Sequence, residues 1–326
     1  MTLKKSWVDS ANSAETEFPL NNLPYGVFST GGDDPRCGVA IGDMILDVRA
    51  AEGAGLTGTD GLFARPSWNA LMAAGPDAWA AFREAVTGLL AEGSDRRDEV
   101  GPMLVRMRDA RLHLPLEVVE YTDFYAGRQH ATNVGTLFRG ADNALPPNWL
   151  HIPIGYNGRA STVVVSGTDI RRPNGQTRAK DAEMPVFGPC KRLDIELEMG
   201  AIVGTPSKMG EPITTSRAQR MIFGYVLLND WSARDLQAWE YQPLGPFQAK
   251  AFATSISPWI VTPAALEPFA CETPEREKEL LPYLHEDFAS LYDIALSVEM
   301  TPDGGRPTTI ARTNYNRLYY SAAQQL

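Results

Sequence analysis

Three carboxylates alternate with apolar residues in the segment DIELEMGAIVG. Asp194, Glu196 and Glu198 are separated by Ile195 and Leu197, so in a β-strand, whose side chains alternate between two faces, the three acids share one face. One interpretation is the solvated outer face of an antiparallel sheet. The other is a divalent cation such as Mg²⁺ or Ca²⁺, which takes oxygen ligands, because like charges repel and the following GAIVG brings no basic neighbour.

A fourth carboxylate closes the apolar run YVLLND. Asp230 therefore lies at the end of a strand that we expect to be buried, where it caps the following helical segment WSARDLQAWE, binds a metal, or does both. Lys250 lies between a Pro/Gly turn and an apolar run. A surface lysine with a buried aliphatic stem is the default expectation. Its uncharged neighbours FQA and AFATS leave burial beside carboxylates as the alternative.

The segment DFYAGRQHATNVGTLFR brings a carboxylate and an imidazole into one predicted helix. Asp123 and His130 are seven residues apart, which on a helix is two turns, the same face and about 10 Å along the axis. That spacing would let Asp123 contact a metal while His130 reaches the far end of a small substrate. A single histidine is more often structural than catalytic, but here several polar residues accompany it. They are Tyr125, Arg128, Gln129 and Arg139.

The elements that must position these residues fall into two groups. Before residue 117, strand-like segments (24–29, 36–48 and 111–118) surround an Ala/Leu-rich helical stretch (67–93). After it, the strand candidates are 161–167, 194–204, 221–230, 258–261 and 293–300. We expect a fold that is mostly β with some α, in two domains, 1–116 and 117–326. Long irregular connections between the strands argue against a doubly wound sheet.

Composition narrows the class of protein. The 326 residues carry 40 acidic and 30 basic side chains, a formal charge of -10, without the basic excess of a nucleic-acid binder. The N-terminus lacks the apolar region of a secretory signal and no run of 18 apolar residues exists. Three dispersed cysteines form no C-x-x-C pair. We therefore expect a cytoplasmic enzyme with no nucleic-acid or membrane partner; no dinucleotide, P-loop or serine-hydrolase motif is present.

Four long segments together carry a resemblance to a known family. They are DFYAGRQHATNVGTLFRG, NALPPNWLHIPIGYNGRASTVVVSGTDIRRPNGQ, FGPCKRLDIELEMGAIVG and NDWSARDLQAWEYQPLGPFQAKAFATSISPW. With SWVDSANSAETEFPLNNLPYGVFS near the N-terminus, the sequence resembles the fumarylacetoacetate hydrolase family along its length. The resemblance implies a small N-terminal SH3-like barrel, a larger C-terminal mixed β-roll and a homodimer.

The resemblance also implies a reaction, the hydrolysis of a carbon–carbon bond in the diketo-diacid 4-fumarylacetoacetate during tyrosine and phenylalanine catabolism. The implied ligands of Ca²⁺ or Mg²⁺ are Asp123, Glu196, Glu198 and Asp230, with Lys250 and Thr254 near a second Mg²⁺ position. His130 is the implied general base and Lys250 a second source of positive charge. The implied substrate contacts are Tyr125, Arg139, Tyr156, Gln237 and Tyr241.

Elementary chemistry agrees with these roles. A neutral imidazole can take a proton from water, and a leaving enolate needs positive charge from a cation or a lysine. Arg139 can pair with a carboxylate of a dianionic substrate. Two alternatives stay open: a related activity, acylpyruvate hydrolysis or 2-oxo acid decarboxylation, and a metal-binding chain without catalysis.

The last motif motivates the second alternative. YNRLYYSAAQQL predicts a helix without a stop signal. Chains of the family continue past it, where the resemblance implies a glutamate that orients the histidine and a substrate-binding threonine. We therefore expect the second domain to be incomplete at residue 326.

Overall fold

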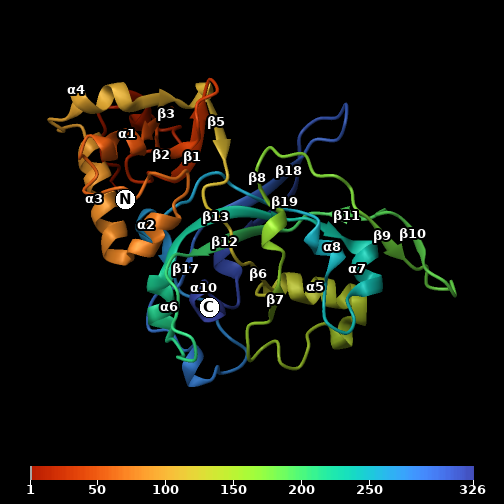
Figure 1. Cartoon of the computed structure of the whole chain (residues 1–326). Helices are drawn as coiled ribbons and strands as arrows, with labels where there is room; N and C mark the ends of the chain where they lie inside the picture. Colours follow the sequence, from red (N-terminus) through yellow and green to blue (C-terminus); the bar gives the residue numbers. More distant parts are fainter. Residues whose placement is uncertain (1) are drawn as a thin grey trace.

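The computed structural model describes residues 2–326, which form an N-terminal and a C-terminal domain of mixed α/β structure (Figure 1). The N-terminal elements are β1 (Tyr25–Thr30), β2 (Arg36–Ile41), β3 (Met44–Asp47), α1 (Val48–Gly53), α2 (Asn69–Ala74), α3 (Pro76–Leu90), α4 (Arg97–Val100), β4 (Leu104–Arg106) and β5 (Ala110–His113). The five strands form one sheet in the order β4-β3-β2-β1-β5, with every neighbouring pair antiparallel.

Local sequence explains these elements. Gly42 has a φ of 56°, which favours glycine, and turns the chain between β2 and β3. Gly75, at φ 89°, separates α2 from α3, and Pro76 occupies the first turn of α3, where proline is tolerated. The strands predicted at 24–29 and 36–48 and the helical stretch 67–93 are thereby confirmed.

The C-terminal domain contains many short elements. They are β6 (Thr122–Phe124), α5 (Arg128–Arg139), β7 (Gly155–Asn157), β8 (Val163–Val165), β9 (Asn174–Thr177), β10 (Val186–Pro189), β11 (Leu193–Asp194), β12 (Leu197–Val203), α6 (Thr215–Met221), β13 (Ile222–Asp230), β14 (Ser232–Ala233), α7 (Arg234–Glu240), α8 (Gln248–Ala251), β15 (Thr254–Ile256), α9 (Pro263–Leu266), β16 (Ala270–Cys271), β17 (Leu291–Tyr292), β18 (Ala295–Met300), β19 (Thr308–Asn314) and α10 (Ala322–Gln325). A four-stranded mixed sheet, β12-β13-β15-β8, is its centre, with only β15 and β8 parallel. Figure 1 shows β12 and β13 curving together across the domain.

The two domains share a hydrophobic core. Tyr25 stacks on Trp68 with ring centroids 4.4 Å apart, and Phe223 from β13 lies 5.8 Å from Tyr25. The Trp68 indole donates to the Gly26 carbonyl at 2.9 Å, so its polar edge is satisfied. Burial of a side chain such as Phe223 contributes about 2 kcal/mol. The central sheet that carries the site residues is therefore anchored against the N-terminal domain.

Two predictions about helices are wrong. Asp123 lies in β6, five residues before α5 begins at Arg128, because the chain there pairs with β7. The predicted C-terminal helix is reduced to a 3₁₀ turn at Tyr315–Arg317 and the short α10. Between these turns the backbone N–H of Tyr319 donates to Ala126 instead of to a helical neighbour.

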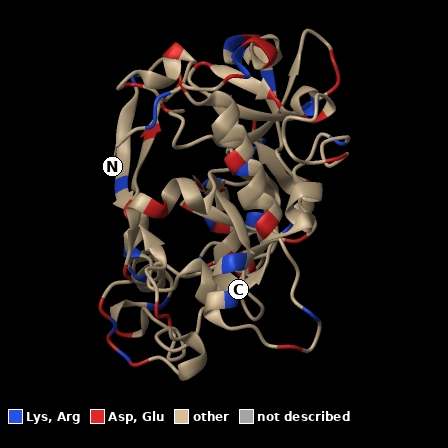
Figure 2. Cartoon of the chain, turned by 90° about the vertical axis from the view of Figure 1, so that its left-hand side faces the viewer, with Lys and Arg blue, Asp and Glu red and all other residues tan. Residues whose placement is uncertain are grey.

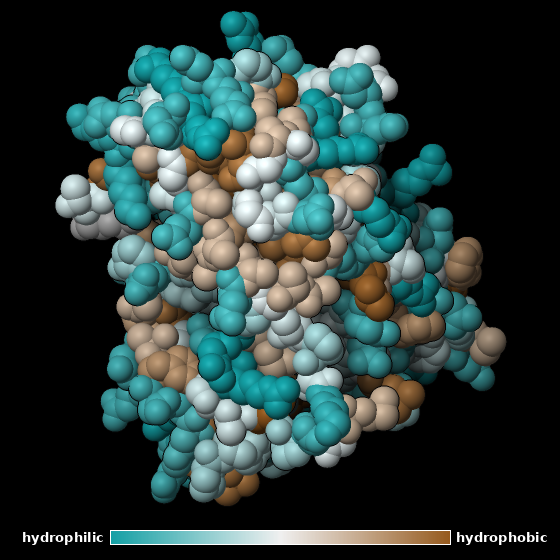
Figure 3. Space-filling view, turned by 60° about the vertical axis from the view of Figure 1, so that its left-hand side comes forward, coloured by the Kyte–Doolittle hydropathy of each residue, from teal (hydrophilic) through white to brown (hydrophobic). Residues whose placement is uncertain are grey.

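The surface mixes residue types. Acidic and basic residues are interspersed along the chain in the view of Figure 2. On the face in Figure 3, apolar side chains reach the surface in small groups among hydrophilic ones. Among residues 2–326, no helix combines the length and the hydropathy that crossing a membrane requires.

Candidate active site

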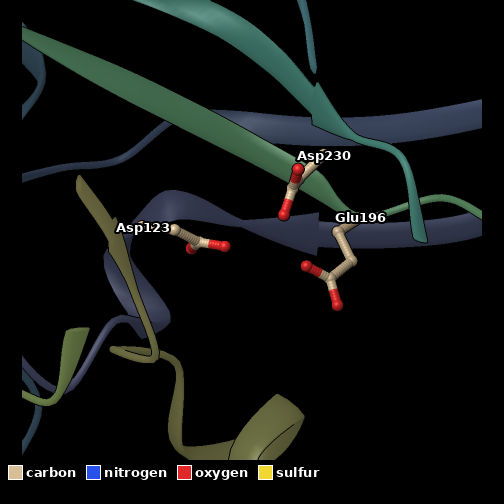
Figure 4. A group of neighbouring side chains, drawn as sticks. All are labelled: Asp123, Glu196 and Asp230. Carbon is tan, nitrogen blue, oxygen red and sulfur yellow. The ribbon is translucent and has the colours of Figure 1, made fainter. Parts of the chain in front are cut away.

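Three carboxylates converge at one end of the central sheet. Asp230 is the last residue of β13 and pairs in register with Thr254 at the start of β15. Its backbone N–H donates to the Glu196 carbonyl at 3.2 Å, so Glu196 lies beside it. Asp123 arrives from β6, and its carboxylate points toward the other two (Figure 4). Oxygens of Asp123, Glu196 and Asp230 all lie within 4.8 Å of one another, which is close enough to share one cation.

Lys250 is buried among these carboxylates. Its side chain is 8% exposed, and its ammonium contacts Glu196 and lies 2.5 Å from Asp230 Oδ2. Burial lowers the lysine pKa, but the charges of Glu196 and Asp230 outweigh burial and hold it above its ordinary value. The default expectation of a surface lysine is therefore wrong, and the alternative, burial beside carboxylates, is what the structure contains.

Glu196 also receives two further basic groups. His130 Nε2 lies 3.3 Å from Glu196 Oε1, and Arg234 Nη2 lies 2.6 Å from the same oxygen. Burial raises the Glu196 pKa, but the hydrogen bond with His130 and the charges of Lys250 and Arg234 lower it well below its usual range. Glu196 is therefore ionised and forms the centre of the charge network.

Asp230 and the neighbouring Glu198 resist ionisation. Burial, offset in part by Lys250 and reinforced by Asp123, raises the pKa of Asp230 to about 8. Burial and the charges of Asp123, Glu196 and Asp230 hold the pKa of Glu198 well above its ordinary value. Glu198 lies outside the group of three whose oxygens meet within 4.8 Å. When ionised, these four acids repel one another, and a bound cation would relieve that repulsion.

Two interpretations of the acidic residues need correction, one for Asp194 and one for Asp230. Asp194 and Glu196 do not belong to one continuous strand, since β11 ends at Asp194 and β12 begins at Leu197. The Asp194 side chain is 49% exposed and pairs with Arg234 at 2.8 Å instead of joining the cluster. Asp230 is not a helix cap either, because the N-cap of α7 is Ala233.

Helix α5 presents His130 to Glu196 from its first turn. The helix begins after Gly127, which gives no side-chain cap. His130 is the third helical residue, and its side chain is 45% exposed, so it stands at the open side of the site. Its ring lies 5.9 Å from Tyr125, edge to face. Asp123 and His130 thus reach one region from separate elements, not from one helix face as predicted.

Hydroxyl groups surround the carboxylates. Tyr156, in β7, donates to Asp123 Oδ2 at 2.5 Å, and Thr254 donates to Asp230 Oδ1 at 3.3 Å. The Tyr125 hydroxyl donates to the Ala131 carbonyl at 2.9 Å. Tyr156 and Thr254 therefore contact predicted metal ligands directly, whereas Tyr125 is held against α5.

The remaining predicted substrate residues lie around α5 and α7. Arg139, the last residue of α5, donates to the backbone carbonyls of Asn143 at 3.1 Å and Ala144 at 2.6 Å. Gln237 is buried, and its side-chain oxygen accepts from Arg234 at 3.0 Å. Tyr241 follows α7, and its ring lies 5.4 Å from Phe138 of α5. None of these three joins the carboxylate group itself.

Sequence reasoning missed Arg234, which links Asp194, Glu196 and Gln237. The sequence did contain a signal for Arg234. This arginine is the first residue of a helix, where the helix dipole favours acidic side chains, so a basic residue there indicates another interaction. The residues that directly follow Glu198 include no basic side chain, and Arg234 lies 36 residues further along the sequence. Arg234 is the first residue of α7 and directly follows β14, the strand partner of β11, in which Ala233 pairs with Leu193.

The donor set fits a hard divalent cation. All three converging side chains offer carboxylate oxygens, the ligands that Ca²⁺ and Mg²⁺ take. The Lys250 ammonium already lies between Glu196 and Asp230, which shows that these oxygens are arranged around positive charge. Asp123, Glu196 and Asp230 are thus the residues that would hold a cation, with Glu198 beside them.

Comparison with known proteins gives the site a family. A family model described as fumarylacetoacetate hydrolase C-terminal matches residues 120–326, and one described as fumarylacetoacetase N-terminal matches residues 21–115. The chain belongs to the fumarylacetoacetate hydrolase family.

Relatives in this family are close. The chain is 50% identical to the fumarylacetoacetase of Bos taurus and 49% to that of Homo sapiens, over 96% of this chain and 77% of each relative. Among solved structures, a putative HpcE protein from Mycobacterium smegmatis superposes with a TM-score of 0.51 at 16% identity, over 91% of this chain and 78% of that one. At that identity, the likeness to the HpcE protein shows the fold alone.

Proposed function

We propose that this chain hydrolyses the carbon–carbon bond of 4-fumarylacetoacetate and releases fumarate and acetoacetate. The observation that carries the proposal is an exposed imidazole, His130, held against Glu196 at the edge of a three-carboxylate cluster. Relatives about half identical to this chain, the fumarylacetoacetases of Bos taurus and Homo sapiens, support the substrate. The activity belongs to tyrosine and phenylalanine catabolism.

The chain's own residues account for the proton transfers. His130, in its neutral form, takes the proton of a water molecule that attacks one carbonyl carbon of the diketone. The carbon–carbon bond then breaks and its electron pair leaves with the acetoacetate fragment as an enolate. The Lys250 ammonium supplies positive charge to the developing enolate. The proton that His130 holds is available to the enolate carbon, which completes the products.

The proposed cofactor is Ca²⁺ or Mg²⁺ on Asp123, Glu196, Glu198 and Asp230. When bound, such a cation supplies Lewis-acid stabilisation of negative charge on the substrate oxygens. Lys250 and Thr254 are proposed neighbours of a second Mg²⁺ position; the hydrogen bond from Thr254 to Asp230 supports placing Thr254 there.

The proposed substrate contacts surround this cluster. Tyr156 is supported by its contact with Asp123, and Gln237 by its contact with Arg234, which touches Glu196. Tyr125 and Arg139 lie close enough for the arginine to offset the rise that burial causes in the Tyr125 pKa. We propose that Tyr125, Arg139 and Tyr241, carried by α5 and the end of α7, receive the anionic end of the substrate.

The finer architecture is also proposed. We place the domain boundary at 116/117, in support of which the two family models match 21–115 and 120–326. The five-stranded antiparallel sheet supports an SH3-like barrel for the first domain. Exposed Met184, Val186 and Phe187 near β10 support a homodimer, since apolar surface favours association. Free thiols at all three cysteines support a reducing, cytoplasmic location.

Replacement of His130 tests the proposal. We expect His130→Ala to abolish the loss of fumarylacetoacetate absorbance while cation binding, measured by calorimetry, is retained. His151→Ala is the matched control, because His151 is an exposed histidine outside the cluster and its removal should leave turnover unchanged. Retained turnover in His130→Ala would remove His130 as the base. Faster hydrolysis of acylpyruvates than of fumarylacetoacetate by the unaltered chain would reject the substrate.

A further inference from the structure

The hydroxyl of Tyr121 is buried and has no hydrogen-bond partner among the described residues. Its aromatic ring is held firmly, because a Cβ at Gly158 would lie only 2.2 Å from the ring, so the ring packs directly on the Gly158 backbone. The Gly158 N–H also donates to the Tyr121 carbonyl at 2.8 Å. A buried, unpaired hydroxyl costs free energy unless something satisfies it, so a fixed one points to a partner.

The Tyr121 side chain lies beside the proposed cation site. Tyr121 lines a cavity of about 130 Å³ together with Asp123, Asp230 and Lys250. It precedes Asp123 by two residues in extended chain, which places both side chains on one side of the strand. One water needs about 10–15 Å³ of such cavity space, so the cavity has room for a cation with several water ligands.

The two carboxylates that line this cavity already have hydroxyl donors. Asp123 accepts from Tyr156 at 2.5 Å, and Asp230 accepts from Thr254 at 3.3 Å. Tyr121 is therefore the third hydroxyl of the cluster, close to that of Thr254, and the one that donates to no described group. Mg²⁺ and Ca²⁺ keep water ligands in protein sites, and groups that hydrogen-bond to the ligand sphere commonly change metal affinity by 10- to 100-fold.

We propose that Tyr121 is a positioning residue of the cation site, whose hydroxyl donates a hydrogen bond to a water ligand of the cation held by Asp123 and Asp230. This inference rests on the cation-assisted function proposed above and deepens it. The phenol does not touch substrate; it acts by orienting the ligand sphere.

The test compares two phenylalanine substitutions in the full chain. Tyr121→Phe removes the hydroxyl and keeps the ring on Gly158. Tyr225→Phe is the matched control, because its hydroxyl is also buried without a partner but lies among Tyr292 and Tyr315. Calorimetric titration with CaCl₂ and with MgCl₂ should give an about 10-fold higher Kd for at least one ion in Tyr121→Phe, and an unchanged Kd in Tyr225→Phe.

Two further readouts separate positioning from a structural role. The urea midpoint of Tyr121→Phe without cation should equal that of the unaltered chain. Its turnover should fall at limiting cation and recover in excess cation. An unchanged Kd for both ions, with normal turnover, overturns the assignment of Tyr121 and leaves the proposed function standing. An equal rise of Kd in Tyr225→Phe also overturns the assignment, and failure of the unaltered chain to bind either ion overturns it together with the proposed cation.

Discussion

Replacement of Lys250 by methionine isolates the balance of charge in the carboxylate cluster. Lys250 is 8% exposed and contacts both Glu196 and Asp230. Methionine keeps most of the side-chain volume but removes the charge, so two buried carboxylates lose their nearest cation. Removing one partner of a buried ion pair costs about 3–5 kcal/mol. Arg234 and His130 still contact Glu196. We therefore expect the free energy of unfolding to fall by the lower limit, about 3 kcal/mol, in the absence of a divalent cation.

The loss should grow with pH. The Asp230 pKa is about 8 in the folded chain against an ordinary value of 3.8, so this group favours folding at low pH, and that stability is lost as pH rises from 3.8 toward 8. Lys250 lowers this pKa, so its removal raises the pKa further and extends the loss above pH 8. Each added pKa unit is worth about 1.4 kcal/mol. If removal of Lys250 raises the Asp230 pKa by about one further unit, Lys250→Met should be destabilised by about 1 kcal/mol more at pH 9 than at pH 6.

Urea unfolding in the presence of a chelator, at pH 6 and pH 9, measures the destabilisation by Lys250→Met and its change with pH. Lys208→Met is the control: Lys208 pairs with Glu211 at the surface and is 76% exposed, so its removal should cost less than about 0.5 kcal/mol. Added Ca²⁺ or Mg²⁺ should restore part of the stability of Lys250→Met, since the cation replaces the missing charge. A Lys250→Met chain as stable as the control at pH 9, or one less affected at pH 9 than at pH 6, would refute this account of the cluster.

Two further predictions concern packing and thiols. Gly135→Ala should destabilise the chain by about 1–3 kcal/mol in urea unfolding, because a Cβ there would lie 1.8 Å from the Ala144 carbonyl oxygen. Gly88, in α3, has nothing within 4 Å of the position that a Cβ would take, so Gly88→Ala should instead stabilise the chain by about 0.5–1 kcal/mol. Equal effects of the two substitutions would contradict the packing argument. Burial, with the hydrogen bond to Asp235, raises the pKa of the Cys190 thiol from 9.0 to about 11, which lowers its thiolate fraction at pH 8 roughly 100-fold. Mass spectrometry after alkylation at pH 8 should therefore find the half-buried Cys271 modified before Cys190, and the reverse order would show that this thiol is not protected.

The parts of the site that followed from the sequence are those fixed by local pattern. An apolar run ending in an acid predicts a buried strand that presents a carboxylate at its end, and Asp230 at the end of β13 confirms this. The uncharged residues around Lys250 left burial beside carboxylates open as an alternative, which the structure contains. In both positions the side chain's environment is decided within a few residues of chain.

The parts that failed depend on pairing between distant segments. Period-two alternation placed Asp194 with Glu196, but β11 pairs with β14 while β12 pairs with β13, and the break between them turns Asp194 outward to Arg234. A helical spacing joined Asp123 to His130, but pairing with β7 draws Asp123 into a strand. Neither partner strand is visible from the local pattern, because strand pairing depends on contacts far apart in the chain.

The charge of the cluster connects its electrostatics to the proposed substrate. Asp123, Glu196 and Asp230 bring three negative charges when all are ionised, and Lys250 and Arg234 bring two positive charges. Burial and the neighbouring carboxylates raise the pKa of Glu198, and while Glu198 stays protonated these five side chains sum to one negative charge, which suits capture of a cation. The proposed divalent cation would reverse the sign of this sum to net positive, which would attract an anionic diketo-diacid in a protein whose overall charge of -10 would otherwise repel it. On this argument a bound cation would favour substrate binding, and the buried Lys250 that pairs with Glu196 and Asp230 in the cation-free chain would become available to the substrate.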